Sequence, residues 1–308
     1  MCLVVATTLN LVACKGATTD NGAVQKEFVY VPEYVKLEDV NWFNATCGTD
    51  EGFYYVNEEW DNHAGTYNNY ICYLDGATGE VSRTALNLTE GLEEGSSANI
   101  QQMTVLSDGT IAVVVSNWVI TNPETYDGVE TYFLKLLSAQ DGNVIAEADI
   151  TADVSGDDMY TYVQYMAADK DDNIYIVSGD NQIFVFDKTC KLAFKIDTSM
   201  DSWIQAMGVS REGQVVYTSW DSVKGGNVIN VIDPATRNVS KTCSNNVPEQ
   251  NGNCTIVPGI ESGIIMSSSK GLTEYDLNTE TATEFLVWLD SDISGDNIDT
   301  VTVLADGR

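Results

Sequence analysis

The sequence predicts an all-β fold, a β-propeller of four-stranded blades, on two observations. Two kinds of turn recur along the 308 residues in fixed order, each joining two short apolar runs. There are only five prolines, and no run shows the 3.6-residue periodicity of an amphipathic helix. Four-stranded units that repeat roughly every 40 to 65 residues indicate blades that stack around an axis and bury their faces on one another. A β-sandwich would not explain two turns in fixed order.

The longer of the two turns is typified by LDGATGEV at 74–81. Asp opens it in four of its five copies, because an Asp side chain can accept a hydrogen bond from the amide two residues ahead. The opening residues of the five copies are Asp75, Ser138, Asp187, Asp233 and Asp276.

A shorter turn precedes each longer one and has the composition of a tight β-hairpin. Its copies are Glu51-Gly52, Asp108-Gly109, Asp172-Asn173, Glu212-Gly213, Ser262-Gly263 and Asp306-Gly307. With both turns in place, the blades fall at 40–88, 100–151, 162–198, 203–247 and 254–290.

A sixth blade begins near Ile298, and the chain ends inside its first hairpin. We therefore expect a propeller over residues 28–308 that is incomplete at its C-terminus, cut from a ring of seven or eight blades. Phe28–Val35 is expected to supply an outer strand that closes the ring.

The N-terminus is predicted to be a lipoprotein signal segment, residues 1–14, followed by a polar linker over 15–27. Its apolar run is too short to span a bilayer and ends in small residues before a cysteine. Leu11-Val12-Ala13-Cys14 resembles a bacterial lipobox, in which Cys14 would carry the lipid. This predicts a bacterial protein anchored at the extracellular face of the cell membrane. The alternative is a buried N-terminal strand with an incidental cysteine.

Charge and cysteine content narrow the possible partners. The chain has 15 Lys+Arg against 46 Asp+Glu, a formal charge of −31. Such a field repels nucleic acid and anionic membrane surfaces, so contact with a membrane is expected only through the lipid anchor. A solvated acidic surface explains the charge, with divalent-cation binding as the alternative.

Five cysteines outside the signal segment are expected to be buried thiols, or Cys243 could pair with Cys254.

The sequence assigns no catalytic residue, no metal ligand and no cofactor. His63 is the only histidine, so a metal cluster held by several histidines is impossible. Any Ser-His-Asp triad would have to use His63. The run from Asp169 to Asn173 has the alternating oxygens of a calcium loop, but Ile174 stands where glycine is required. A plain turn is therefore predicted there, with calcium as the weaker alternative.

A candidate binding face is predicted from the loops between the second and third strands, which vary most in length. These loops should share one face with the connections between blades, the usual recognition surface of such folds. An aromatic ring beside a carboxylate suits a sugar, because the ring stacks on the apolar face of the sugar while the carboxylate bonds its hydroxyls. The alternative is that the tryptophans pack between blades. The candidate residues are Trp60, Asp61, Tyr67, Trp118, Tyr126, Trp220 and Asp221.

With the lipobox, YVPEYV at 30–35 and the TGEV-type turns, the chain resembles surface lipoproteins of anaerobic, gut-type Firmicutes. In that class a lipid-anchored propeller precedes an extracellular solute-binding domain of the type that feeds ABC importers. The resemblance implies lipid attachment at Cys14 and a role beside nutrient import.

The favoured function is a non-enzymatic binding module that engages a small solute, glycan, peptide or envelope protein, accessory to nutrient capture. The first alternative is an extracellular glycan-active hydrolase or lyase that uses loop carboxylates. The second is a scaffold for other envelope proteins.

Overall fold

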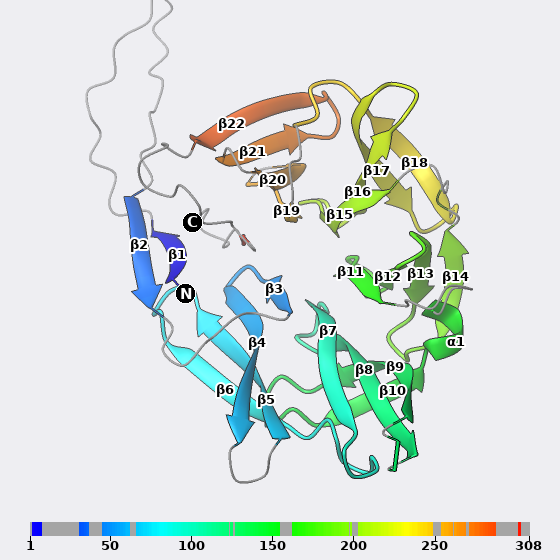
Figure 1. Ribbon diagram of the computed structural model, residues 1–308. Coiled ribbons are helices and arrows are strands. Elements are labelled where there is room, and N and C mark those ends of the chain that lie inside the picture. Colours follow the sequence, from blue (N-terminus) through cyan, green and yellow to red (C-terminus); the bar gives the residue numbers. More distant parts are fainter. Residues whose placement is uncertain are drawn as a thin grey trace, which may run out of the picture.

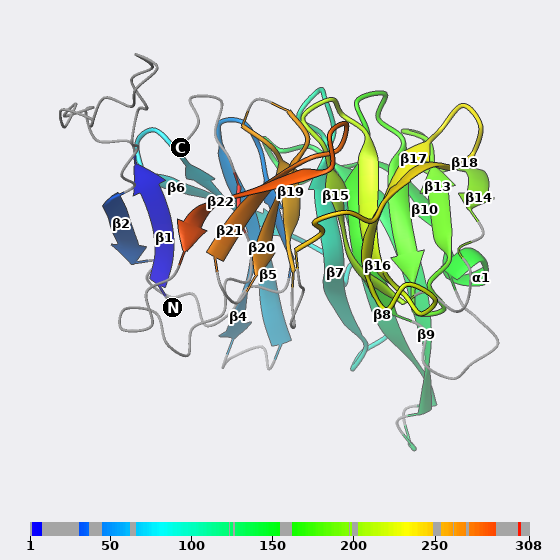
Figure 2. The same cartoon turned by 90° about the horizontal axis from the view of Figure 1, so that it is seen from above.

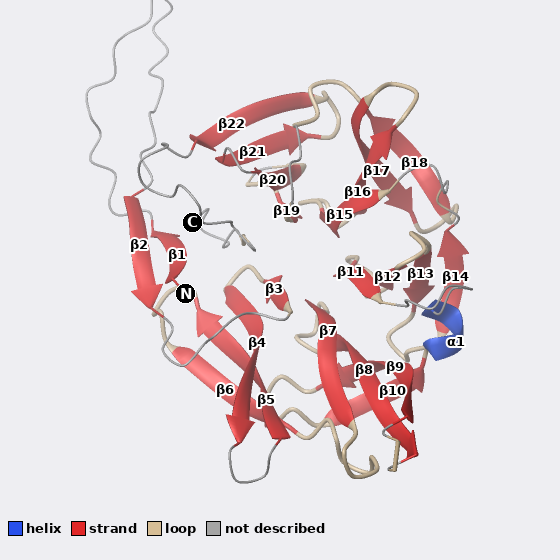
Figure 3. Cartoon of the chain, viewed as in Figure 1, coloured by secondary structure: helices blue, strands red, loops and turns tan. Residues whose placement is uncertain are grey.

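A computed structural model describes residues 2–7, 31–36, 45–61, 66–122, 124–125, 127–154, 162–196, 198, 203–248, 254–260, 262–268, 271–287 and 301–302. It confirms the predicted all-β propeller with five complete blades, each an antiparallel four-stranded sheet, arranged around an axis (Figure 1). Among the described residues the one helix is α1, Thr151–Val154 (Figure 3). The total number of blades in a closed ring stays a prediction.

Each blade runs from an inner strand near the axis to an outer strand at the rim (Figure 1). Blade 1 comprises β3 (Thr46–Gly48), β4 (Gly52–Asp61), β5 (Thr66–Asp75) and β6 (Val81–Leu86). Blade 2 comprises β7 (Ser97–Val105), β8 (Ile111–Asn122), β9 (Asp127–Leu137) and β10 (Val144–Asp149). Blade 3 comprises β11 (Val163–Ala168), β12 (Ile174–Ser178), β13 (Ile183–Phe186) and β14 (Leu192–Ile196). Blade 4 comprises β15 (Ile204–Val209), β16 (Val215–Asp221), β17 (Gly226–Asp233) and β18 (Asn238–Cys243). Blade 5 comprises β19 (Ile256–Pro258), β20 (Ile264–Ser268), β21 (Gly271–Asp276) and β22 (Thr281–Val287).

Segments from both ends of the sequence lie between blade 5 and blade 1. There β1 (Cys2–Thr7) pairs with β2 (Val31–Lys36), and the two-stranded sheet lies between β22 and β6 in the ring (Figure 1). Val301 packs against the Val257–Ile265 pair of blade 5, and the Thr302 hydroxyl donates to the Thr49 carbonyl of blade 1 over 3.3 Å. The expected closing segment, 28–35, thus overlaps β2 over residues 31–35, and β2 pairs with β1. The signal-segment interpretation of residues 1–14 stays a prediction.

The longer turns are organised by Asp as the sequence predicts. Asp75 Oδ1 accepts from the amide of Ala77 at 2.9 Å, and Asp187, Asp233 and Asp276 each accept from the amide two residues ahead. In the blade 2 copy Asp141 does this instead, within the turn that Ser138 opens. Each turn then needs a residue with positive φ, a conformation that glycine adopts most easily. These residues are Gly79, Gly142, Cys190, Arg237 and Glu280.

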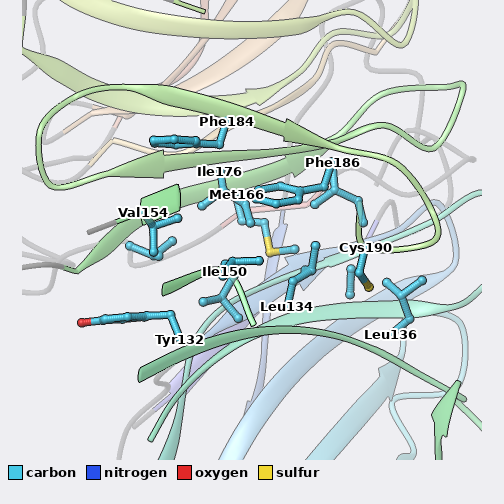
Figure 4. Close-up of a cluster of buried hydrophobic side chains, with 14 of the residues drawn as sticks. Tyr132, Leu134, Leu136, Ile150, Val154, Met166, Ile176, Phe184, Phe186 and Cys190 are labelled. Carbon is cyan, nitrogen blue, oxygen red and sulfur yellow. The ribbon is translucent and has the colours of Figure 1, made fainter. Parts of the chain in front are cut away.

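A separate apolar cluster fills each of the four spaces between consecutive blades. Between blades 2 and 3, Leu134 and Leu136 of β9 meet Ile176, Phe184 and Phe186 of β12 and β13 (Figure 4). These clusters exist because side chains alternate along a strand, so every second residue of a blade faces the preceding blade and the others face the following one.

The cysteines outside residues 1–14 are unpaired, and four of the five are buried. The alternative of a Cys243–Cys254 disulfide is therefore wrong, and the prediction of thiols in the core is confirmed for four residues, with Cys47 half-buried. Burial raises the pKa of Cys190 to about 11 and that of Cys254 to about 12. Within the described ranges, no helix has the length and apolar character that crossing a bilayer requires.

Candidate functional site

One end of the ring carries the hairpin loops between second and third strands together with the connections between blades; we call it the loop face. Both leave from the same end of an antiparallel four-stranded blade. The β8–β9 hairpin, with strands of 12 and 11 residues, reaches farther than its neighbours at this face (Figure 2, lower edge). In blade 3 the corresponding strands β12 and β13 have only 5 and 4 residues.

Three predicted tryptophans lie at this face in equivalent positions of blades 1, 2 and 4. The exposed fractions of these residues are 52% for Trp60, 43% for Trp118 and 45% for Trp220. Each follows by four residues a fully buried valine, Val56, Val114 or Val216, that packs toward the next blade. Strand alternation turns each ring toward the same side as its valine but beyond the end of the core.

In blade 1, Trp60 meets a second predicted residue. Trp60 and Tyr67 are directly opposite in the β4–β5 register, with ring centroids 4.9 Å apart in an edge-to-face arrangement. The Tyr67 side chain is also well exposed. Asp61 ends β4 opposite Thr66, but its side chain, like Cys14 and Tyr126 as a whole, lies outside the described residues.

In blade 2, the Trp118 ring lies across the neighbouring strand. A Cβ atom added to Gly128 of β9 would be 2.5 Å from Cε2 of the indole, so the ring occupies the space that a glycine leaves. In the strand register Trp118 stands opposite Glu130.

In blade 4, the carboxylate of Asp221 is used by its own turn. Its Oδ1 accepts from the amides of Val223 and Lys224, at 2.9 and 3.0 Å. The structure therefore brings Trp220 and Asp221 together in one hairpin, but with the carboxylate already hydrogen-bonded to the backbone.

Two further exposed aromatic residues, Tyr162 and Trp203, were not predicted. Each directly precedes an inner strand, β11 or β15, and so lies at the loop face. Ile204 pairs with Ser219, which places Trp203 next to Trp220 in the register. The sequence feature that could have predicted both is an aromatic residue directly before the apolar run of an inner strand, in TYVQYM and SWIQAM.

A repeated β-bulge near the loop face was also missed. In the inner strands of blades 2, 3 and 4 the register skips one residue, and the skipped residues are Gln101, Gln164 and Gln205. The pattern Ile/Val-Gln-x-Met marks all three. A bulge redirects the backbone groups around it.

The bulges connect neighbouring blades. The Gln164 carbonyl accepts from Nε2 of Gln102 in the preceding blade at 2.9 Å, and the Gln205 carbonyl accepts from the hydroxyl of Tyr165 at 2.6 Å. The inner strands are thus joined by hydrogen bonds that pass from one blade to the next, which holds the aromatic residues before β11 and β15 in place.

Where the core between blades 1 and 2 approaches the loop face, it becomes polar. Glu58 stands opposite Asn69 in blade 1, and Asn117 stands opposite Thr131 in blade 2. We call these four residues the polar rung. Asn69 and Asn117 are each only 5% exposed, and their Oδ1 atoms, together with Thr131 Oγ1, are buried without a hydrogen-bond partner.

Elsewhere the Asp169–Asn173 segment is a turn in blade 3. Asp169 Oδ1 accepts from the amides of Asp171 and Asn173, and Oδ2 accepts from the Tyr175 hydroxyl and the Asn173 side-chain amide. Across the described part of the chain, no group of three or more His, Cys, Asp or Glu residues is arranged to hold a metal ion.

Comparison with known proteins gives similar structures but no family. No protein-family model and no curated protein matches the sequence. A protein of unknown function from Bacteroides caccae shares the fold at a TM-score of 0.52 and 10% identity, with 87% of this chain and 88% of that chain covered. Virginiamycin B lyase from Staphylococcus aureus aligns at a TM-score of 0.46 and 11% identity, over 80% of this chain and 85% of that one.

A third similar structure, YCF48 bound to D1 peptide, aligns at a TM-score of 0.40 and 11% identity, over 85% of this chain and 72% of that one. At such identities the likeness concerns the fold alone. The five four-stranded blades make the chain a β-propeller protein, and its function has to be argued from the loop face.

Proposed function

We propose that this β-propeller is a non-enzymatic binding module that takes a carbohydrate on its loop face. The observation that carries the proposal is the exposure of Trp60, Trp118 and Trp220 at equivalent positions of three blades, all at one end of the ring. Exposed aromatic rings gathered on one face are a feature of interaction sites, whereas scattered apolar residues need no explanation.

Carbohydrate is the ligand class that fits this chemistry best. A sugar ring has an apolar face that stacks on an indole and hydroxyls that bond to carboxylates and amides. On the same face of blade 1 as the Trp60–Tyr67 pair, the next polar pair in the strand register is Glu58 and Asn69, one step closer to the core. The formal charge of −31 disfavours anionic polymers, so the preferred ligand is neutral.

Several exposed aromatic side chains on one rigid propeller favour an extended ligand. Contacts on separate blades bind a polymer more tightly than any one contact, because the second contact forms within an existing complex. We further propose that the module is displayed outside a bacterial cell on a lipid at Cys14 and assists nutrient capture, as the resemblance to surface lipoproteins implies.

The test is binding to a panel of neutral polysaccharides by affinity electrophoresis and calorimetry. Trp60→Ala, Trp118→Ala and Trp220→Ala are each expected to weaken binding about threefold to tenfold, the size of one aromatic contact. The matched control is Ile145→Ala, because Ile145 is also a well-exposed apolar residue but lies near the start of the outer strand β10, at the opposite end of the blade.

Two outcomes would contradict the proposal. One is binding that no tryptophan variant changes. The other is release of shortened or unsaturated sugars from the polymer, which would support the hydrolase or lyase alternative instead.

A further inference from the structure

We propose that the polar rung, Glu58, Asn69, Asn117 and Thr131, is a cation site that takes calcium and joins blade 1 to blade 2. This inference does not rest on carbohydrate binding.

The four side chains face one another across the space between the two blades. Val56 and Ile71 of blade 1 and Val115 of blade 2 belong to one apolar cluster. Glu58, Asn69 and Asn117 each lie two residues from one of these in the same strand, so they project into the same space, one step closer to the loop face. Thr131 joins them as the register partner of Asn117.

Three oxygens of this rung, from Asn69, Asn117 and Thr131, lack the partner that buried oxygens normally have. Nearly all buried polar groups have a hydrogen-bond partner. Here Asn69 Oδ1, Asn117 Oδ1 and Thr131 Oγ1 have none, although they come from two different blades.

A polar rung in blade 4 shows the contrast. There Nδ2 of Asn230 donates to Ser219 Oγ at 3.0 Å, and the Thr242 hydroxyl donates to Asn230 Oδ1 at 2.8 Å. The polar side chains of that rung bond to one another, whereas Asn69 Oδ1, Asn117 Oδ1 and Thr131 Oγ1 have no partner.

The donor set selects the kind of ion. Calcium binds carboxylate and amide carbonyl oxygens. It takes about six to eight ligands and accepts water in the remaining positions. Soft metals prefer sulfur and imidazole, which the rung lacks. Glu58 supplies the carboxylate, and the large negative charge of the chain raises the local concentration of cations.

Terbium luminescence tests the site, because Tb³⁺ replaces Ca²⁺ and emits when a nearby indole or phenol transfers energy to it. Trp60 and Tyr67 stand one step beyond Glu58 and Asn69 on the same side of blade 1. We expect terbium emission on indole excitation, displaced by Ca²⁺, reduced several-fold by Trp60→Phe and unchanged by Trp220→Phe.

Glu58→Gln keeps the shape of the side chain and removes its charge, and is expected to weaken Ca²⁺ binding at least tenfold. Asn69→Leu is a second variant, expected to abolish the rise in melting temperature that Ca²⁺ produces after EDTA treatment. The proposal is overturned if terbium emission and the melting temperature respond to the ions alike in wild type and Glu58→Gln, as binding to scattered surface carboxylates would produce. Absence of any response to Ca²⁺ in wild type would also overturn it.

Discussion

At the scale of single residues, the loop face depends on where the strands end relative to the core. Trp60, Trp118 and Trp220 each lie four residues beyond a buried valine on the same side of the strand, past the end of the apolar core, and each is left about half exposed. The rings are held by local contacts, Tyr67 beside Trp60 and Gly128 beneath Trp118.

Gly128→Ala is predicted to displace the Trp118 ring. The new Cβ would come within 2.5 Å of the indole, closer than any real contact, while the strand backbone itself accepts alanine. We expect a change in indole fluorescence and the same loss of ligand affinity as in Trp118→Ala. Gly226→Ala is the control, because no atom lies within 4 Å of its added Cβ. Full affinity in Gly128→Ala would show that the Trp118 ring plays no part in binding.

At the scale of turns and strands, the carboxylates that open the long turns are expected to contribute to acid stability. The Thr189 hydroxyl and amide lower the pKa of Asp187, and backbone amides lower the pKa of Asp233 and Asp276. A carboxyl whose pKa is lower in the folded state stabilises the fold above its unfolded pKa, about 3.9. That stabilisation is lost as the pH falls through the lowered folded value.

We therefore expect the triple variant Asp187→Asn, Asp233→Asn, Asp276→Asn to lose less melting temperature than wild type between about pH 5 and 2.5. Asn keeps the oxygen that accepts the amide bond but does not titrate. A control triple variant, Glu93→Gln, Glu94→Gln, Glu124→Gln, removes the same charge from exposed positions outside these turns. Equal acid slopes in wild type and the Asp→Asn variant would contradict the prediction.

The inner strands of blades 4 and 5 meet at Gly208 of β15. An added Cβ would lie 2.2 Å from the carbonyl oxygen of Ile256 in β19, a backbone atom that cannot rotate away. Gly208→Ala is expected to reduce the free energy of unfolding by about 1–3 kcal/mol, as overpacking of a core does. Urea denaturation beside Gly226→Ala would measure it, and unchanged stability would mean that the two strands separate without cost.

At the scale of the whole molecule, the sequence was sufficient for the blades because the turns that separate them are local. Asp75, Asp187, Asp233 and Asp276 form their turn bonds within four residues, so their pattern is readable without a structure. The Gln164 and Gln205 bulges were not predicted, since their hydrogen bonds reach residues of another blade.

The candidate site was predictable in part for the same reason. Trp60, Trp118 and Trp220 could be placed on one face from hairpin length alone. The polar rung could not, because it requires knowing that Asn69 and Asn117 lie two residues beyond the buried Ile71 and Val115 and face each other across two blades.

The proposed lipid anchor is also a prediction at the scale of the whole molecule. We expect radioactive palmitate to label the protein when it is expressed in a bacterial host, and Cys14→Ala to abolish the label and release the protein from the membrane fraction. Cys2→Ala is the control, with labelling retained. Absence of label in the wild-type protein would contradict the proposed lipid anchor and the proposed display at the cell surface.

Each apolar cluster lies between two neighbouring blades. The end of each tryptophan hairpin extends past the cluster of its blade and does not contribute to the packing between blades. New specificity could therefore be introduced one hairpin at a time, by grafting or by natural variation, while the remaining blades keep their shape. The β8–β9 hairpin, already the longest, is the natural place to begin such an exchange (Figure 2).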